Sequence, residues 1–205
     1  MLHFNTISAD LAGLYELLLA EASFNNLYLV GGTALALQIG HRKSIDLDFY
    51  SHSPMNMQNL VNDLSALGKL KIVNQTENIL NAYLNNIKLD VIYQNVELLK
   101  PILKFEAYRL ASIEDIAAMK LLAITNRGSK KDFIDFHFIL KEFTLKELLN
   151  FYQTKFPQHL PFTTIKSLTY FDDADLQPMP LMLMDVTWEE VKDKIKRSSK
   201  TFGLG

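Results

Sequence analysis

Short apolar runs alternate with helix-spaced apolar positions along the first half of the chain. Strands are predicted at 27–30, 45–50, 70–73, 79–84, 87–93 and 105–110, where apolar or alternating residues lie between turn signals. Asn85-Asn86 joins two of these runs as a hairpin turn, since asparagine tolerates positive φ. Helices are predicted from Ser8 to about 22, over 33–39, and from the Ser53-Pro54 start to 67.

The pattern from Ser112 onward is helical. Helices are predicted from 112 to about 128, over 130–140, from the Thr144/Glu147 capping pair, and from a second such pair at 187 and 190. An acidic, proline-containing loop is predicted at 172–180. The expected fold class is therefore α/β (α+β), with a mixed-sheet core at 1–110 and a helical region at 111–205 packed on it.

Composition narrows the class of protein. The chain has 205 residues, is 48% hydrophobic, and carries a net charge of −2, so no global attraction to nucleic acid and no DNA specificity are expected. It has no cysteine, which excludes disulfides and thiolate chemistry. It shows neither a secretory signal nor an apolar run of about 18 residues, so a cytoplasmic protein without membrane contact is expected.

The most informative stretch is 31–50. Gly31 and Gly32 follow an apolar run and open a predicted helix, an arrangement that lets backbone N–H groups approach an anion. Asp46 and Asp48 follow inside a second apolar run, where alternation places them on one face. An anion cradle facing two carboxylates suits a metal–nucleotide complex. The purely structural alternatives are that the glycines only permit a tight turn and that the two aspartates are an ordinary surface feature.

Further polar side chains extend this candidate site. Asp90 comes from a strand otherwise rich in core residues, and three carboxylates from two strands suit Mg²⁺ or Mn²⁺, although Asp90 could instead pair with Lys88. In the functional interpretation, the hydroxyl and N–H of Thr33 hold a β- or γ-phosphate. Arg42 either pairs a triphosphate or holds Asp46 in place.

A second group of charges lies in the helical region. Lys120 and Arg127 are seven residues apart and share a helix face, and Asp132 and Asp135 share another. Spacing alone favours an ordinary solvated helical hairpin with salt bridges. A lysine inside the apolar run 116–124 needs a partner or an open cleft, which favours phosphate contact for Lys120.

These motifs together resemble the AbiEii/AbiGii-type nucleotidyltransferases of the DNA polymerase β-like superfamily, which include toxins of bacterial abortive-infection and toxin–antitoxin systems. The resemblance rests on Gly-Gly-Thr-Ala-Leu at 31–35, Gly-His-Arg-Lys-Ser-Ile-Asp-Leu-Asp-Phe at 40–49, and the later spacing of Lys120, Arg127, Asp132 and Asp135. It implies a nucleotidyltransferase core at 1–110 and a helical region after it.

The resemblance also implies roles for particular residues. The expected catalytic residues are Asp46, Asp48, Asp90, Lys120 and Asp132, with the first three binding the metal. The expected nucleotide-binding residues are Gly31, Gly32, Thr33, Arg42, Ser44, Lys120 and Arg127.

The expected function is Mg²⁺- or Mn²⁺-dependent transfer of NMP from an NTP to a hydroxyl of RNA, such as tRNA, or of a protein, in a toxin with a possible cognate antitoxin. The alternative is a catalytically inactive module of the same fold that binds a nucleotide or a partner.

Overall fold

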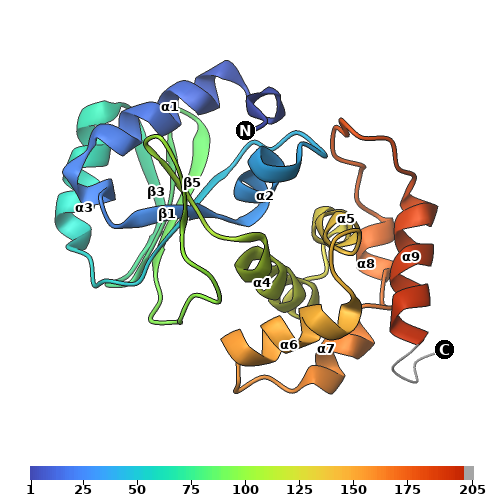
Figure 1. The fold of residues 1–205 in the computed structure, drawn as a ribbon. Coiled ribbons are helices and arrows are strands. Elements are labelled where there is room, and N and C mark those ends of the chain that lie inside the picture. The colour runs from blue at the N-terminus through green and yellow to red at the C-terminus, as the bar shows by residue number, and fades with distance from the viewer. Residues whose placement is uncertain (201–205) are drawn as a thin grey trace. The chain divides into compact units, whose positions relative to one another are not determined.

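The computed structural model describes residues 1–200 and resolves the chain into two compact units (Figure 1). The sheet unit comprises Met1–Glu97 and Pro101–Ala111. The helical unit comprises Leu98–Lys100 and the chain from Ser112 onward.

A seven-stranded mixed sheet forms the centre of the sheet unit, in the order β3-β4-β5-β2-β1-β7-β6. β2 pairs antiparallel with β1 and parallel with β5, and β1 pairs parallel with β7, while the remaining neighbours are antiparallel. The mixed α/β class predicted from the pattern is confirmed. The strands are β1 (Leu27–Val30), β2 (Leu47–Ser51), β3 (Leu70–Gln75), β4 (Ile79–Leu84), β5 (Ile87–Tyr93), β6 (Leu103–Phe105) and β7 (Tyr108–Leu110).

The sheet unit also contains the α-helices α1 (Ala9–Ala20), α2 (Gly31–Ile39) and α3 (Met57–Leu67) and two short 3-10 helices at Phe4–Thr6 and Ala22–Phe24. Ser8 caps α1 by accepting from the backbone N–H of Leu11, as the sequence predicted. Tyr15 of α1 packs edge-on against Phe49 of β2, with ring centroids 5.4 Å apart. Burial along β2 alternates, so Leu47, Phe49 and Ser51 face the core while Asp48 and Tyr50 face the other side.

Several boundaries in the sheet unit differ from the pattern: α2 begins at Gly31 and not at 33, and β3 extends to Gln75. β2 begins at Leu47, so Asp46 lies just before the strand and not within it. The run 105–110 is not one strand: Phe105 ends β6, Glu106 takes a φ of 54° in the turn, and β7 begins at Tyr108. α3 begins at Met57, capped by Asn56 in place of the predicted Ser53.

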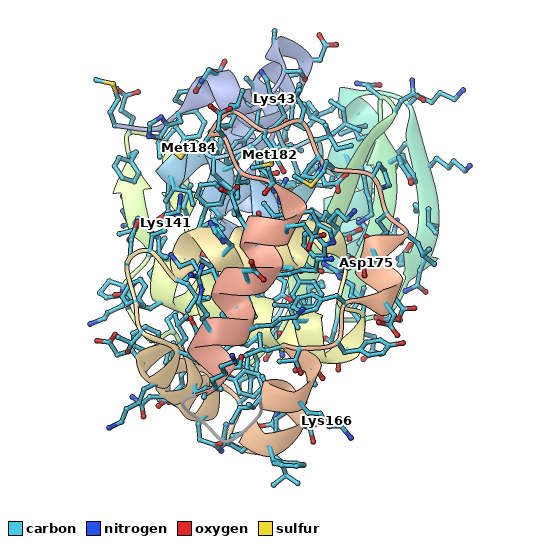
Figure 2. All side chains as sticks on the ribbon, turned by 90° about the vertical axis from the view of Figure 1, so that its right-hand side faces the viewer. Lys43, Lys141, Lys166, Asp175, Met182 and Met184 are labelled. Atoms are coloured by element: carbon cyan, nitrogen blue, oxygen red, sulfur yellow. The ribbon has the colours of Figure 1, made fainter. Side chains whose placement is uncertain are left out.

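The helical unit consists of α4 (Ile113–Asn126), α5 (Lys130–Ile139), α6 (Leu145–Lys155), α7 (Pro161–Ser167), α8 (Asp172–Asp175) and α9 (Trp188–Lys200). Phe133, Phe171 and Trp188 pack together from three parts of this unit, with ring centroids 4.9 to 6.1 Å apart. The predicted loop at 172–180 begins with α8, whose Asp175 (labelled in Figure 2) accepts from the Trp188 indole and pairs with Lys192. No helix within residues 1–200 is long and apolar enough to cross a membrane.

A buried ion pair links α4 to α6 in the helical unit. Asp115 on α4 lies 2.6 Å from Lys155 Nζ on α6, and both side chains are almost completely buried. The same carboxylate accepts from the backbone N–H groups of Leu99 and Lys100 and from the Ser112 hydroxyl. This full set of partners explains how a carboxylate is accommodated in the core.

Because of His137 on α5, we expect the stability of the folded protein to depend on pH. Burial, and then the nearby charges of Lys194 and Lys141, outweigh the opposing effect of Glu190 and lower the pKa of His137 to about 4. The unfolded chain takes up this proton near pH 6.5, whereas the folded chain resists it, so acid favours unfolding across that window. We expect the free energy of unfolding to fall by about 1–3 kcal/mol between pH 7 and pH 4 from this group.

Urea unfolding of the wild type and of His137→Phe at several pH values measures this effect. The variant has no imidazole to protonate and is expected to lose less stability than the wild type over the same range. Equal losses in the two proteins would contradict the assignment.

Candidate functional site

The glycine turn between β1 and α2 lies directly against Asp48. Gly31 has a φ of +70°, a backbone conformation that residues with a side chain rarely adopt. A β-carbon added there would lie 2.6 Å from Asp48 Oδ2, so the close approach also requires glycine. Val30, which precedes the helix, gives α2 no side-chain cap. The first N–H groups of α2 therefore lie beside a carboxylate, with no capping side chain over them.

Asp48 and Asp90 are register partners on the adjacent parallel strands β2 and β5. Register partners on neighbouring strands share a face, so both carboxylates project from the same side of the sheet. Asn81 of β4 is the next residue in this row, opposite Asp90, and donation from the amide of Asn74 to Asn81 extends the row onto β3. The structure thus brings together two of the predicted acids at one end of a polar row, next to Val30 of β1.

Lys88 places a positive charge beside these acids. It precedes Asp90 by two residues on β5, and its Nζ lies 2.5 Å from Asp90 Oδ2. Partial burial acts to lower its pKa, but the hydrogen bond to Asp90 and the charges of Asp90, Asp48 and Asp46 outweigh it, so the pKa of Lys88 lies above its ordinary value. The pairing of Asp90 with Lys88 that the sequence left open is present.

Asp46 is held through its backbone. Its carbonyl accepts from the Thr33 hydroxyl, which also shares a 2.8 Å hydrogen bond with Ser44 Oγ. Thr33 and Ser44 are buried, and these bonds tie the start of α2 to the segment that leads into β2. Arg42 is buried as well and donates to the Lys43 carbonyl 2.9 Å away. The hydroxyl of Thr33, predicted to face a phosphate, thus bonds within the protein.

The residues present fit a hard divalent cation. Asp90 Oδ1 is buried and accepts no hydrogen bond in the described structure, while Oδ2 of the same carboxylate is paired with Lys88. Such an oxygen suits a cation that takes oxygen ligands. Within residues 1–200, no three His, Asp or Glu side chains are already gathered into a metal-binding group. The arrangement is therefore two register-paired carboxylates with a lysine, and Asp46 close enough to act on that lysine.

The second predicted cluster lies inside the helical unit. Lys120 Nζ is 2.9 Å from Asp132 Oδ1 and 2.6 Å from Asp135 Oδ2. Arg127 Nε lies 2.9 Å from Asp132 Oδ2, and the Ser129 hydroxyl donates to the same oxygen. Burial acts to raise the pKa of Asp132, but the charge of Lys120, aided by Arg127 and Ser129, holds it well below its usual range.

Burial corrects the interpretation of this cluster as a solvated hairpin. Asp132 and Asp135 have no exposed surface and Lys120 is 5% exposed, so these charges are part of the interior. Lys120 is buried and has the carboxylates of Asp132 and Asp135 as partners. Arg127 is the exposed member, with 62% of its side chain accessible. It follows α4 as the C-cap residue, and it meets Lys120 at the same Asp132 carboxylate.

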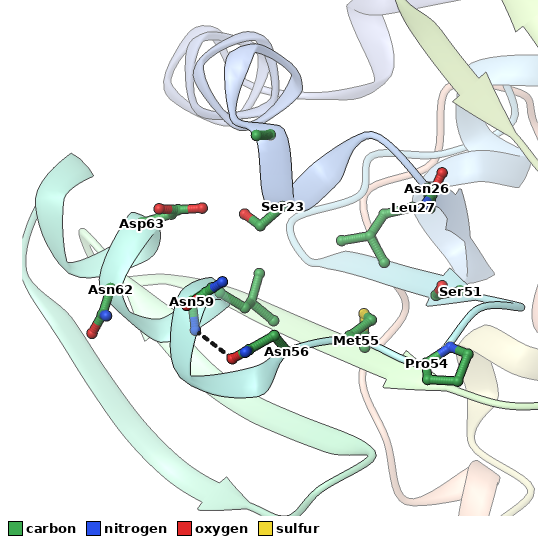
Figure 3. A pocket seen from close by; sticks show the side chains of 12 residues that line it. Ser23, Asn26, Leu27, Ser51, Pro54, Met55, Asn56, Asn59, Asn62 and Asp63 are labelled. Atoms are coloured by element: carbon green, nitrogen blue, oxygen red, sulfur yellow. Dashed lines mark hydrogen bonds between the residues drawn. The ribbon is translucent and has the colours of Figure 1, made fainter.

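A separate pocket of about 470 Å³ lies in the sheet unit (Figure 3). It is lined mainly by small polar side chains, among them Ser23, Asn26, Asn56 and Asn59. Leu27 and Ser51, which also line it, form the register pair at the end of β1 and β2 away from Val30 and Asp48. The pocket therefore lies apart from the glycine turn and its carboxylates.

Comparison with known proteins matches the chain to a family. The family described as "Nucleotidyl transferase AbiEii toxin, Type IV TA system" matches residues 13–202. The uncharacterized protein aq_aa25 of Aquifex aeolicus (strain VF5) is 34% identical over 191 residues, covering 87% of this chain and 88% of its own.

Two solved structures share the fold. JHP933 from Helicobacter pylori aligns with a TM-score of 0.59 at 23% identity, over 95% of this chain and 92% of its own. The nucleotidyltransferase toxin MenT4 from Mycobacterium tuberculosis H37Rv aligns with a TM-score of 0.50 at 13% identity, over 92% and 82%. The match across nearly the whole sequence, on a fold shared with such a toxin, shows that this chain belongs to the AbiEii family of nucleotidyltransferase toxins and is a nucleotidyltransferase.

Proposed function

We propose that the protein transfers an NMP group from an NTP to an acceptor hydroxyl in a reaction that needs Mg²⁺ or Mn²⁺. The observation that carries this proposal is the pairing of Asp48 with Asp90 on adjacent strands, beside the N-terminus of α2. Anion-binding N–H groups next to two carboxylates suit a triphosphate that arrives with a divalent cation.

The first turn of α2 is the phosphate site of this proposal. Its leading N–H groups, from Gly31, Gly32 and Thr33, have no helical carbonyl partner and carry the positive end of the helix dipole. The Thr33 hydroxyl holds the Asp46 segment in place, which leaves the backbone N–H of Thr33 as its contribution to phosphate binding.

Asp46, Asp48 and Asp90 are the residues we assign to the metal. A bound divalent cation would neutralise charge on the transferring phosphoryl group and orient it. The chain itself supplies carboxylate oxygens from β2 and β5, together with the residue just before β2. Arg42 and Ser44 are buried in the segment that carries Asp46, so we assign them to positioning that segment.

The proposed reaction is a single displacement at the α-phosphorus. The acceptor oxygen forms a bond to the α-phosphorus, the bond from that phosphorus to the β-bridging oxygen breaks, and pyrophosphate leaves. We assign the proton of the acceptor hydroxyl to Asp90 Oδ2, because Oδ1, which has no hydrogen-bond partner in the described structure, is assigned to the metal.

We also assign roles to Lys120, Arg127 and Asp132 of the helical unit. Lys120 and Asp132 form a buried pair, and the Asp132 carboxylate accepts from Nε and Nη2 of Arg127. We assign this pair to holding the largely exposed Arg127 side chain, which we assign to phosphate binding. Lys120 acts here through Asp132, as a positioning residue.

The acceptor and partners follow from the same proposal. The AbiEii description names a type IV toxin–antitoxin system, so we propose a cytoplasmic toxin with a cognate antitoxin. The acceptor hydroxyl is on RNA such as tRNA, or on a protein. We propose neither a membrane nor a specific DNA sequence as a partner.

A labelling experiment tests the function. Purified protein is incubated with Mg²⁺, each α-labelled NTP in turn, and total bacterial RNA or lysate protein. The wild type is expected to transfer label to RNA or protein, and the double variant Asp46→Asn with Asp48→Asn is expected to be at least about a hundredfold slower.

The matched control is Asp63→Asn. Asp63 lies on α3 beside the separate pocket, so the control removes an acid of the same unit without touching the proposed site. The control is expected to label acceptors like the wild type. Undiminished transfer by the double variant would contradict the metal assignment, and NTP binding without transfer by the wild type would favour the inactive binding module.

A further inference from the structure

The ammonium group of Lys88 occupies the acid cluster of the sheet unit. Lys88 Nζ lies 2.5 Å from Asp90 Oδ2, with 40% of the lysine side chain and 17% of the aspartate side chain exposed. Asp48 is the register partner of Asp90, and both Asp48 and Asp46 act electrostatically on Lys88. The charge of Lys88 therefore offsets part of the negative charge of this cluster.

The placement of Lys88 follows from strand geometry. Residues two apart on a strand share a face, so a lysine at 88 is carried to the side of the sheet where Asp90 projects. The long, flexible stem of lysine lets its charge move by several ångströms without a change in the backbone. Lys88 was not among the expected site residues, although its spacing from Asp90 was visible in the sequence.

The two oxygens of Asp90 have different surroundings. Oδ2 accepts from Lys88, whereas Oδ1 is buried and has no hydrogen-bond partner in the described part of the chain. A buried carboxylate oxygen without a partner is unfavourable, and a hard cation at that position would satisfy it. A dication there would also meet the positive charge of Lys88 at short range, so the two cations would repel each other.

We propose that Lys88 is an internal counter-ion that competes with the divalent cation for the acid cluster. When the metal binds together with its nucleotide, the ion pair between Lys88 and Asp90 breaks. This inference rests on the metal site of the proposed function. The ammonium neutralises Asp90 while the site lacks a metal, which weakens metal binding in the absence of nucleotide. A triphosphate offers the displaced ammonium a new anion, so nucleotide and metal bind better together than apart.

Binding of Mn²⁺ alone, without nucleotide, tests this role. Free Mn²⁺ is followed by electron paramagnetic resonance for the wild type, Lys88→Met and Lys88→Arg. Lys88→Met is expected to bind Mn²⁺ about tenfold more tightly than the wild type, because one positive charge beside a dication has been removed. Lys88→Arg keeps the charge and is expected to bind like the wild type.

Lys104→Met is the matched control, because Lys104 is an exposed lysine on β6, at the edge of the same sheet far from β5. It is expected to leave Mn²⁺ affinity unchanged. Thermal unfolding without metal shows that each variant is folded, and the rise in melting temperature on adding Mn²⁺ gives a second measure of affinity.

The outcomes separate this inference from the proposed function. Equal or weaker Mn²⁺ binding by Lys88→Met overturns the role of Lys88, while transfer by the wild type keeps the function standing. A purely structural role for Lys88 would loosen the metal site, which is the opposite of the expected result. Absence of Mn²⁺ binding in the wild type and in both variants overturns the metal site together with the counter-ion.

Discussion

Lys120→Met is expected to lower the free energy of unfolding by about 3–5 kcal/mol, the range for removing one partner of a buried ion pair. The ammonium of Lys120 lies within 2.9 Å of one buried carboxylate and 2.6 Å of another. Asp132 would keep Arg127 and Ser129 as partners, whereas Asp135 would lose a close cationic partner. Urea unfolding of the variant beside the wild type measures the loss.

The pH dependence of the Lys120→Met effect identifies its cause. Without Lys120, the buried carboxylate of Asp135 loses a close positive charge and burial favours its protonated form, so the folded variant gains stability as the pH falls. The difference in stability between wild type and variant is therefore expected to be smaller at pH 5 than at pH 8. Replacing Asp135 by asparagine in the Lys120→Met background is expected to restore part of the loss.

The control for this prediction is Lys146→Met, on the exposed side of α6. Its effect is expected to stay within about 0.5 kcal/mol, as for most surface substitutions. A loss below about 1 kcal/mol for Lys120→Met would show that the buried carboxylates do not depend on this lysine.

Gly31→Ala is expected to reduce nucleotidyl transfer by about a hundredfold and to cost about 1–2 kcal/mol of stability. The stability cost comes from placing a β-carbon at a φ of +70°. The loss of activity comes from Asp48, whose carboxylate must move away from a new atom 2.6 Å from Oδ2. A displacement of about 1 Å at a reacting centre is enough for such a loss.

Gly13→Ala provides a matched control for the same substitution. Gly13 lies within α1, and an added β-carbon would meet nothing within 4 Å. The control is expected to keep full activity and to gain about 0.5–1 kcal/mol of stability, because alanine favours helix. Transfer assays and urea unfolding on both variants give the comparison, and a fully active Gly31→Ala would contradict the close approach of Asp48 to the turn.

The sequence by itself predicted the local features of the candidate site. A glycine pair after a buried strand, acids at alternating positions and a lysine among apolar helix residues are visible because side-chain direction in strands and helices follows fixed periods. The same local rules located the Ser8 and Thr144 caps and the Asn85-Asn86 hairpin, since these depend on neighbours a few residues apart.

Only the tertiary structure decided which of these residues meet. The pairing of Asp48 with Asp90 depends on the parallel register of β2 and β5, two strands far apart in the chain, and no local pattern sets that register. The burial of Lys120 between Asp132 and Asp135 depends on the packing of α5 against α4. Local sequence thus fixed which way each side chain points, while long-range packing determined whether a charge faces water, another strand or a buried partner.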